Sequence, residues 1–113
     1  MSVDLNIPFD LIVTIVNKGG SETIIKATKS AGAEGGTIIP GRGTGIREQK
    51  KLWGIPIEPE KDIVLTIVPQ EKTQIVLDAI LEQGSLNKPG AGIAFVVDLK
   101  KVVGICHMCQ LDT

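Results

Sequence analysis

A strand–helix–strand unit that occurs twice is the feature of this sequence that most constrains its fold. The segment Ile12–Asn17 (IVTIVN) is echoed by Val64–Pro69 (VLTIVP), and each leads into a helical pattern, a glycine turn and another apolar strand. The pattern predicts strands at Phe9–Asn17, Gly36–Ile39, Asp62–Val68 and Ile93–Asp98, with a short further piece at Lys101–Ile105. This β-α-β-β-α-β order is that of an α+β ferredoxin-like sandwich, in which two helices cover one face of an antiparallel sheet.

Both helices are expected between recognisable start and stop residues. Ser21 is the expected N-cap of the first helix, with Glu22 in its first turn and Gly32 in the left-handed position beyond its end. The second helix is expected to begin after Pro69 and to stop at Gly84. Apolar residues recur at helical spacing in both segments: Ile24, Ala27 and Ala31, then Ile75, Val76, Ala79 and Ile80.

The first and third strands are apolar on both faces, although two helices cover only one. Phe9, Leu11, Val13 and Ile15 alternate with Ile12 and Val16, while Ile63, Leu65 and Ile67 alternate with Val64 and Val68. A second apolar face of this size would be an exposed patch on a monomer. The simplest cover is another copy of the chain, so we predict a homo-oligomer packed through the backs of its sheets.

Composition indicates one globular domain spanning residues 1–113, because the chain is 42% hydrophobic and 22% charged. A formal net charge of −1 provides no basic surface for nucleic acid. No apolar run approaches the roughly 20 residues of a membrane span, so no direct membrane insertion is expected. The first residues lack the pattern of a secretory signal, and we therefore expect a cytoplasmic protein.

Two glycine clusters follow or precede predicted strands. Gly41, Gly43 and Gly45 alternate at the start of a long loop at residues 40–61, where they permit positive φ and close backbone approach to a ligand. Gly90 and Gly92 belong to a glycine turn at residues 85–92. Backbone N–H groups in such turns can form an anion-binding concavity. Neither cluster matches the phosphate-loop or dinucleotide fingerprint, and each alone also fits a flexible loop.

Taken in order, these segments resemble the PII nitrogen-regulatory signalling proteins over about Phe9 to Ile105. The resemblance rests on AGAEGGTI, on RGTG at the base of the family's long T-loop, on PIEPEKDIVLTIVP at the return from it, and on KPGAGIAFVVDL at its B-loop and fourth strand. The long loop corresponds to the T-loop and the glycine turn to the B-loop. The resemblance implies a homotrimer of ferredoxin-like subunits, with an adenine nucleotide in each intersubunit cleft between these two loops.

The resemblance also assigns residues to the cleft. The nucleoside pocket would comprise Ile15, Thr37, Gly43, Thr44, Gly45 and Ile67. Backbone N–H groups of Gly90, Ala91 and Gly92 would meet phosphate. A lysine and two arginines that hold phosphate in the family are replaced by Ile93, Gly104 and Cys106, and Arg42, Arg47 and Lys88 are the expected partial substitutes.

These replacements indicate a divergent member with altered ligand choice. Arg47 stands where the family has a glutamine used in Mg-ATP and 2-oxoglutarate binding, and a guanidinium has no acceptor for a cation. We therefore expect AMP or ADP to bind at least as well as ATP, without a strong Mg²⁺ requirement. The chain contains no tyrosine, which excludes uridylylation of a T-loop tyrosine.

The long loop is expected to bind a partner protein, either a membrane transporter or a metabolic enzyme. Trp53 either anchors its own loop, against the body or a neighbouring subunit, or docks onto that partner. Lys50 and Lys51 form a solvated face or meet an acidic partner surface.

The C-terminal tail at residues 106–113 holds Cys106, His107 and Cys109. These residues are either two reduced thiols beside a histidine, or a redox or shared metal-binding group. They supply at most three ligands where a structural zinc takes four, so no metal site is predicted.

Two other function classes remain open beside a nucleotide-binding regulator. One is a sensor of a small anion, such as a carboxylate or bicarbonate, held by Arg42 or Arg47. The other is a metal-binding trimer resembling the CutA proteins. An enzyme is not expected, because the sequence has no Ser–His–Asp set and no paired carboxylates at motif spacing.

Overall fold

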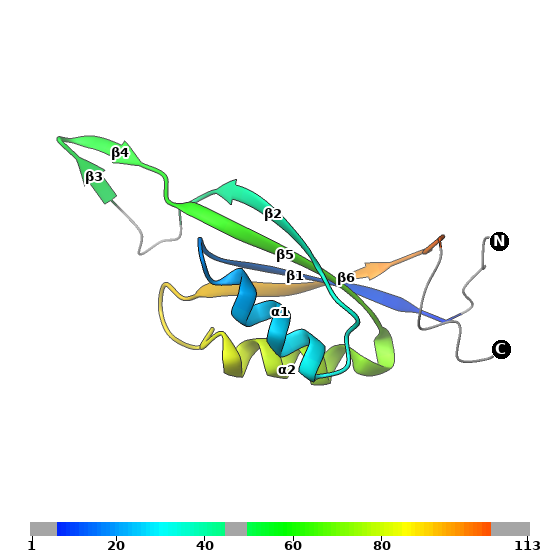
Figure 1. Cartoon of the computed structure of the whole chain (residues 1–113). Coiled ribbons are helices and arrows are strands. Elements are labelled where there is room, and N and C mark those ends of the chain that lie inside the picture. Colours follow the sequence, from blue (N-terminus) through cyan, green and yellow to red (C-terminus); the bar gives the residue numbers. More distant parts are fainter. Residues whose placement is uncertain (1–6, 45–49, 105–113) are drawn as a thin grey trace.

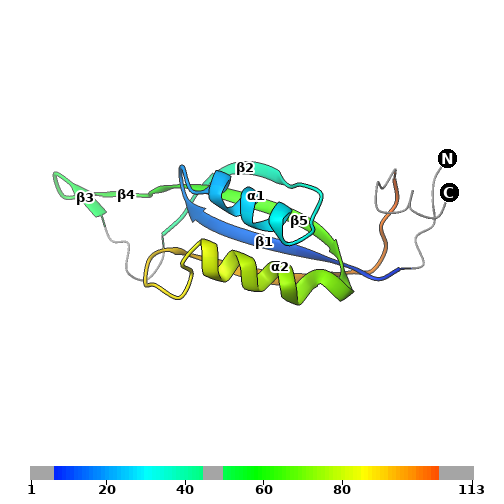
Figure 2. The same cartoon turned by 60° about the horizontal axis from the view of Figure 1, so that its bottom comes forward.

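The computed structural model describes residues 7–44 and 50–104. Its elements, in chain order, are β1 (Phe9–Asn17), α1 (Ser21–Ser30), β2 (Thr37–Arg42), β3 (Lys50–Leu52), β4 (Ile55–Ile57), β5 (Glu60–Pro69), α2 (Gln70–Gln83) and β6 (Gly92–Leu99). Four strands form an antiparallel sheet in the order β2-β5-β1-β6, and both helices lie against one face of it (Figures 1 and 2). The predicted α+β ferredoxin-like fold is confirmed.

The strand bounds differ from the prediction mainly at the long loop. β2 runs on to Arg42 and β5 already begins at Glu60, because the two strands stay paired out to these residues. A separate hairpin of β3 and β4 lies within the loop and extends beyond the sheet (Figure 1). The short strand expected at Lys101–Ile105 is wrong for residues 101–104, which form no strand, and Ile105 lies outside the described residues.

The start of α1 also differs from the prediction. Its N-cap is Gly20, which makes no side-chain capping bond, and Ser21 is the first helical residue. The Asp62 carboxylate of β5 lies beside this helix end, where it accepts a hydrogen bond of 3.0 Å from the Gly19 N–H, one residue before the cap. The helix ends as predicted, with Gly32 in the left-handed region at φ +108°.

The core lies between the sheet and the helices. Its buried apolar residues are Ile12, Val16, Ile24, Ala33, Val64, Val68, Val76 and Ile80. Thr14 and Thr66 share this side of the sheet and are also fully buried. Among the described residues, neither threonine hydroxyl has a hydrogen-bond partner.

The opposite face of the sheet, here called the open face, is apolar, and no helix of the described residues lies over it. The strand register places three rows of paired residues there: Ile39, Ile63, Ile15 and Ile93; Thr37, Leu65, Val13 and Phe95; and Ile67, Leu11 and Val97. Ile93 is 57% exposed and Phe95 is 44% exposed. The expectation that both faces are apolar is therefore confirmed within one chain.

Candidate functional site

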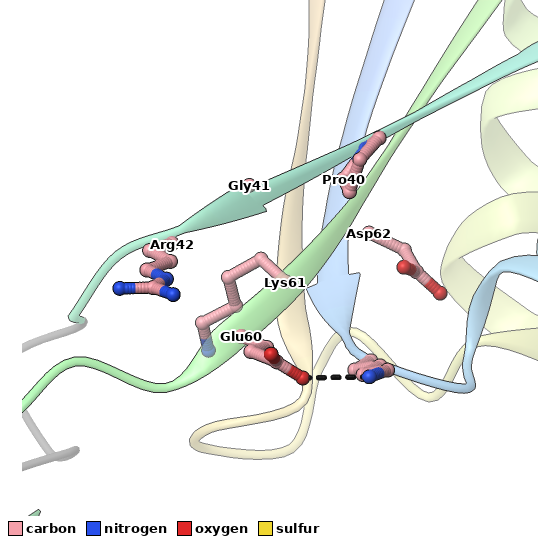
Figure 3. Close-up of a pocket in the computed structure, with 7 residues that line it drawn as sticks. Pro40, Gly41, Arg42, Glu60, Lys61 and Asp62 are labelled. Carbon is pink, nitrogen blue, oxygen red and sulfur yellow. Dashed lines mark ion pairs between the residues drawn. The ribbon is translucent and has the colours of Figure 1, made fainter.

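A pocket of about 310 Å³ lies where β2, β5 and β1 meet the long loop (Figure 3). Its lining residues are Lys18, Pro40, Gly41, Arg42, Glu60, Lys61 and Asp62. Arg42 and Glu60 are register partners at the ends of β2 and β5. Just beyond them, the Gly43 N–H donates to the Pro59 carbonyl at 3.2 Å. The pocket therefore sits beside the stem from which the loop departs.

Two carboxylates in this pocket are already committed to partners in the chain. Lys18 and Glu60 form an ion pair at 2.8 Å, which raises the pKa of Lys18 and lowers the pKa of Glu60. Hydrogen bonds from the Gly19 N–H and then from Ser21 hold the pKa of Asp62 below its ordinary value. Both acids are therefore anionic at neutral pH and balance part of the positive charge of the pocket.

Two cationic side chains from adjacent strands extend toward the same end of the pocket. Figure 3 shows Arg42 on β2 and Lys61 on β5 in this arrangement. Arg42 is exposed, whereas Lys61 is buried. The Arg42 guanidinium is therefore the more accessible cation for a small anion at this position.

The glycine turn meets the loop stem within one chain. The Asn17 Nδ2 donates to the Gly90 carbonyl at 3.3 Å, and the Asn17 Oδ1 accepts from the Lys61 Nζ at 2.6 Å. The turn then packs tightly on β1 at Gly92, whose φ is +148°. A Cβ at Gly92 would lie 2.5 Å from the Ile15 carbonyl oxygen, so this position requires glycine.

The three expected phosphate donors in the glycine turn are not equivalent. The Ala91 N–H already donates to the Lys88 carbonyl at 3.2 Å. Within the described part of the chain, the Gly90 N–H makes no hydrogen bond. Gly90 has a φ of +80° and space around its α-carbon, so its N–H is the donor that this turn leaves available.

The described glycines at the start of the long loop have an ordinary backbone conformation. Neither Gly41 nor Gly43 has a positive φ; Gly41 is an ordinary residue of β2, opposite Lys61. A Cβ at Gly43 would meet no atom within 4 Å. The positive φ that glycine permits is therefore not used at these two positions, and Gly45 lies outside the described residues.

The predicted nucleotide residues fall into two groups at different positions on the sheet. The first group lies near the loop stem and the glycine turn and consists of Ile15, Arg42, Gly43, Thr44, Lys88, Gly90, Ala91 and Gly92. Thr37 pairs with Leu65, and Ile67 pairs with Leu11, so these two residues lie further along the sheet. Arg47, like Gly45, is outside the described residues.

The hairpin tip presents Trp53 to solvent. Trp53 and Gly54 connect β3 to β4 with φ values of +55° and +79°, the signs of a type I′ turn. Trp53 is 91% exposed, so its indole is not anchored on the described part of its own chain. Lys50 and Lys51 lie in β3, opposite Ile57 and Pro56.

The remaining candidate residues give no site in the described ranges. Cys106, His107 and Cys109 lie outside them. Residues 7–44 and 50–104 hold no group of three or more His, Cys, Asp or Glu residues placed to share a metal ion. Neither described helix has the length and apolar character needed to cross a membrane.

Sequence reasoning did not identify four residues that shape this site: Asn17, Lys18, Glu60 and Lys61. The available signal was the run EPEK immediately before the third predicted strand, together with Asn17 at the end of the first strand and Lys18 directly after it. Antiparallel pairing brings the end of the first strand next to the start of the third, as the register Asn17↔Lys61 shows.

Comparison with known proteins agrees with this fold. The chain resembles the solved B. subtilis GlnK–ATP complex with a TM-score of 0.64 at 15% identity, over 81% of this chain and 82% of that one. A second structure of B. subtilis GlnK gives a TM-score of 0.62 at 14% identity, over 82% and 86%. No curated protein matches the chain. The sequence model of one family, nitrogen regulatory protein P-II, matches residues 9–107, and the chain belongs to that family.

Proposed function

We propose that this chain is a homotrimeric signalling protein that binds an adenine nucleotide between protomers and reports its occupancy to a partner through the long loop. Membership of the P-II family supports a regulator rather than an enzyme. The similarity to a GlnK–ATP complex supports an adenine nucleotide as the ligand. The proposal places the protein in the cytoplasm.

The observation that carries the proposal is the separation of the two residue groups on the open face. Ile15 and Ile67 are both assigned to the nucleoside pocket, yet Ile67 pairs with Leu11, four residues along β1 from Ile15. That spacing corresponds to about 13 Å along a strand. A cleft that combines Ile15 and Gly43 of one protomer with Thr37 and Ile67 of its neighbour brings both groups to one ligand.

The open face supports the same assembly. Its three apolar rows leave Ile93, Phe95 and Ile67 substantially exposed in one chain. Full burial of one such side chain contributes about 1.5–3 kcal/mol, so packing the faces of several copies together is strongly favourable. A trimer with cyclic symmetry is closed. At each of its interfaces, one surface of a protomer contacts a different surface of its neighbour.

Ligand choice follows from the cations near the glycine turn. Ile93 and Gly104 stand where the family has phosphate-binding cations, and each lost charge-assisted hydrogen bond is worth about 1.5–3 kcal/mol. The Gly90 N–H, Lys88, Arg42 and Arg47 remain to bind a shorter phosphate chain. The proposal is therefore that AMP or ADP binds at least as well as ATP, without a strong need for Mg²⁺.

The hairpin tip is the proposed docking element for a membrane transporter or a metabolic enzyme. Trp53 is nearly fully exposed there, and a bulky residue with positive φ is strained and rare. Tryptophan is enriched among residues that dominate interface energies. Lys50 and Lys51 in the same hairpin favour a partner with an acidic rim around an apolar pocket.

A small-anion sensor is the second candidate, because the described pocket is small and presents the Arg42 guanidinium. A volume of about 310 Å³ is at the lower limit for ligand sites, which suits a carboxylate or bicarbonate. In this reading the anion is bound in place of the nucleotide phosphates or beside them.

Calorimetry on the full chain tests the proposal. AMP, ADP and ATP are titrated with and without Mg²⁺ and 2-oxoglutarate, and bicarbonate and acetate are titrated separately. The expected result is binding of AMP or ADP that is comparable to or tighter than that of ATP. Tight ATP binding that requires Mg²⁺ and strengthens with 2-oxoglutarate contradicts the ligand choice. Binding of bicarbonate alone supports the second candidate.

A further inference from the structure

The side chain of Asn17 lies between the glycine turn and the stem of the long loop. Asn17 is the last residue of β1, and its two amide atoms have different partners. Its Nδ2 donates to the Gly90 carbonyl at 3.3 Å, and its Oδ1 accepts from the Lys61 Nζ at 2.6 Å. These partners are 73 and 44 residues away along the chain. One side chain therefore connects two segments that share no backbone hydrogen bond with each other in the described residues.

On the loop side, Lys61 is fixed in place. It is 9% exposed and lies directly opposite Asn17 in the register of β1 and β5. The stem continues from Lys61 toward the loop, where the Lys18 N–H donates to the Glu60 carbonyl and the Gly43 N–H donates to the Pro59 carbonyl, each at 3.2 Å. A displacement of Lys61 is therefore transmitted to the first paired residues of the long loop.

On the turn side, the contact is made by the peptide group between Gly90 and Ala91. Its carbonyl oxygen accepts from Asn17, and its N–H donates to the Lys88 carbonyl at 3.2 Å. A peptide group is planar and rigid, so its C=O and N–H ends rotate together. Within the described residues the Gly90 N–H is free and is the first donor that an anion meets, and an anion that also takes the adjacent Ala91 N–H away from Lys88 must turn the Gly90 carbonyl relative to Asn17.

We propose that Asn17 is a positioning residue that couples the 90–91 peptide group to Lys61, so that an anion bound at the glycine turn changes the stem of the long loop. The identity of that anion as a nucleotide rests on the proposed function. The link itself is a property of the unliganded chain and is tested there separately.

Two substitutions each remove one of the two hydrogen bonds made by the Asn17 side chain. Asn17→Asp keeps the oxygen that accepts from Lys61 but loses the N–H donor to Gly90. Lys61→Met keeps most of the apolar side chain but loses the ammonium donor to Asn17. Gln83→Glu is the matched control, since it makes the same amide-to-carboxylate change at an exposed residue outside both segments.

Hydrogen exchange of the full unliganded chain, followed by mass spectrometry, is the first measurement. Each variant is expected to raise exchange roughly tenfold in both segments, 88–92 and 59–62, because one hydrogen bond is lost and the segments are coupled. The control leaves both unchanged. A residue with only a local role gives a different result: Asn17→Asp affects the turn alone and Lys61→Met the stem alone. That outcome overturns the proposal.

The second measurement repeats the exchange experiment with saturating ADP. In the wild-type chain, ADP is expected to change exchange at residues 59–62. In the Asn17→Asp variant, ADP binds by calorimetry but leaves these residues unchanged. An unaltered response in the variant overturns the coupling. If ADP fails to bind the wild-type chain, the proposed function is wrong, while the unliganded experiment still decides whether Asn17 links the two segments.

Discussion

Ile15 and Ile67 lie on the same open face of the sheet but in different rows of its register. Ile15 pairs with Ile63, whereas Ile67 pairs with Leu11, so one row of residues separates them. We propose that the two side chains reach one nucleoside from different protomers. In the proposed function, ligand binding then depends on assembly, because the proposed site is complete only at a boundary between two copies.

The first prediction concerns the apolar open face. Phe95→Glu is expected to convert the assembly to monomers, because it places an unpaired charge in the buried centre of the proposed contact. Ile75→Glu is the matched control, since Ile75 is an exposed apolar residue on α2, on the helical side of the molecule. Light scattering at micromolar concentration measures both masses. Equal masses for the two variants, or a monomeric wild type, contradict the prediction.

The second prediction compares two glycines near the site. Gly92→Ala is expected to lower the free energy of unfolding by at least about 1–3 kcal/mol, because its Cβ meets the Ile15 carbonyl oxygen and its φ is +148°. Gly43→Ala is expected to change it by less than about 0.5 kcal/mol, since its Cβ meets nothing within 4 Å. Urea denaturation measures the free energy of unfolding of both variants. Equal changes at the two positions contradict the close contact described for Gly92.

The third prediction concerns the two buried threonines of the sheet. Thr14→Val and Thr66→Val are expected to leave stability unchanged or to raise it, because each removes a buried hydroxyl that has no partner among the described residues. Thr28→Val is the control, since the Thr28 hydroxyl donates to the Ile25 carbonyl at 2.9 Å. Loss of this hydrogen bond is expected to lower the free energy of unfolding by about 1 kcal/mol. A comparable loss at all three positions in thermal unfolding refutes this account of the core.

The fourth prediction is the pH dependence of the Asp62 contact. The pKa of Asp62 is lowered in the folded chain, mainly by the Gly19 N–H, so its contribution to stability is present above the ordinary value of 3.8. The contribution is lost as pH falls through the lowered pKa. Asp62→Asn is therefore expected to be less stable than wild type near pH 7, with the difference disappearing in acid. A difference that grows as pH falls below 3.8 has the wrong sign.

The main elements were predictable because local pattern and long-range packing agree in them. β1 has the predicted bounds, since its apolar run, interrupted by Asp10 and Thr14, ends at the polar Asn17. α2 begins after Pro69 and ends at Gly84, as proline and glycine require. The hairpin of β3 and β4 was missed because each of its strands has three residues, too few to show a period of two.

The site was less predictable because it depends on contacts between distant segments. Ser21 fits an N-cap locally, but Gly20 holds that position, and the carboxylate of Asp62, from another strand, accepts from the Gly19 N–H beside it. Lys61 and Asn17 meet only through the register of β5 and β1. The family resemblance assigned Thr37 and Ile15 to one pocket, and only the register reveals that they lie in different rows.

Subunit mixing tests the central claim most directly. Gly43→Glu and Thr37→Glu each place a repulsive carboxylate in one half of the proposed cleft, so neither variant alone is expected to bind ADP. Their assembly is checked first by light scattering.

The two variants are then unfolded together in urea at equal concentration and refolded. If each cleft takes Gly43 from one protomer and Thr37 from its neighbour, random mixing regenerates intact clefts, and calorimetry should recover about a quarter of the wild-type ADP sites. If both residues act within one protomer, no site is regenerated. Correctly assembled mixtures that bind no ADP, while the wild type does, contradict the account.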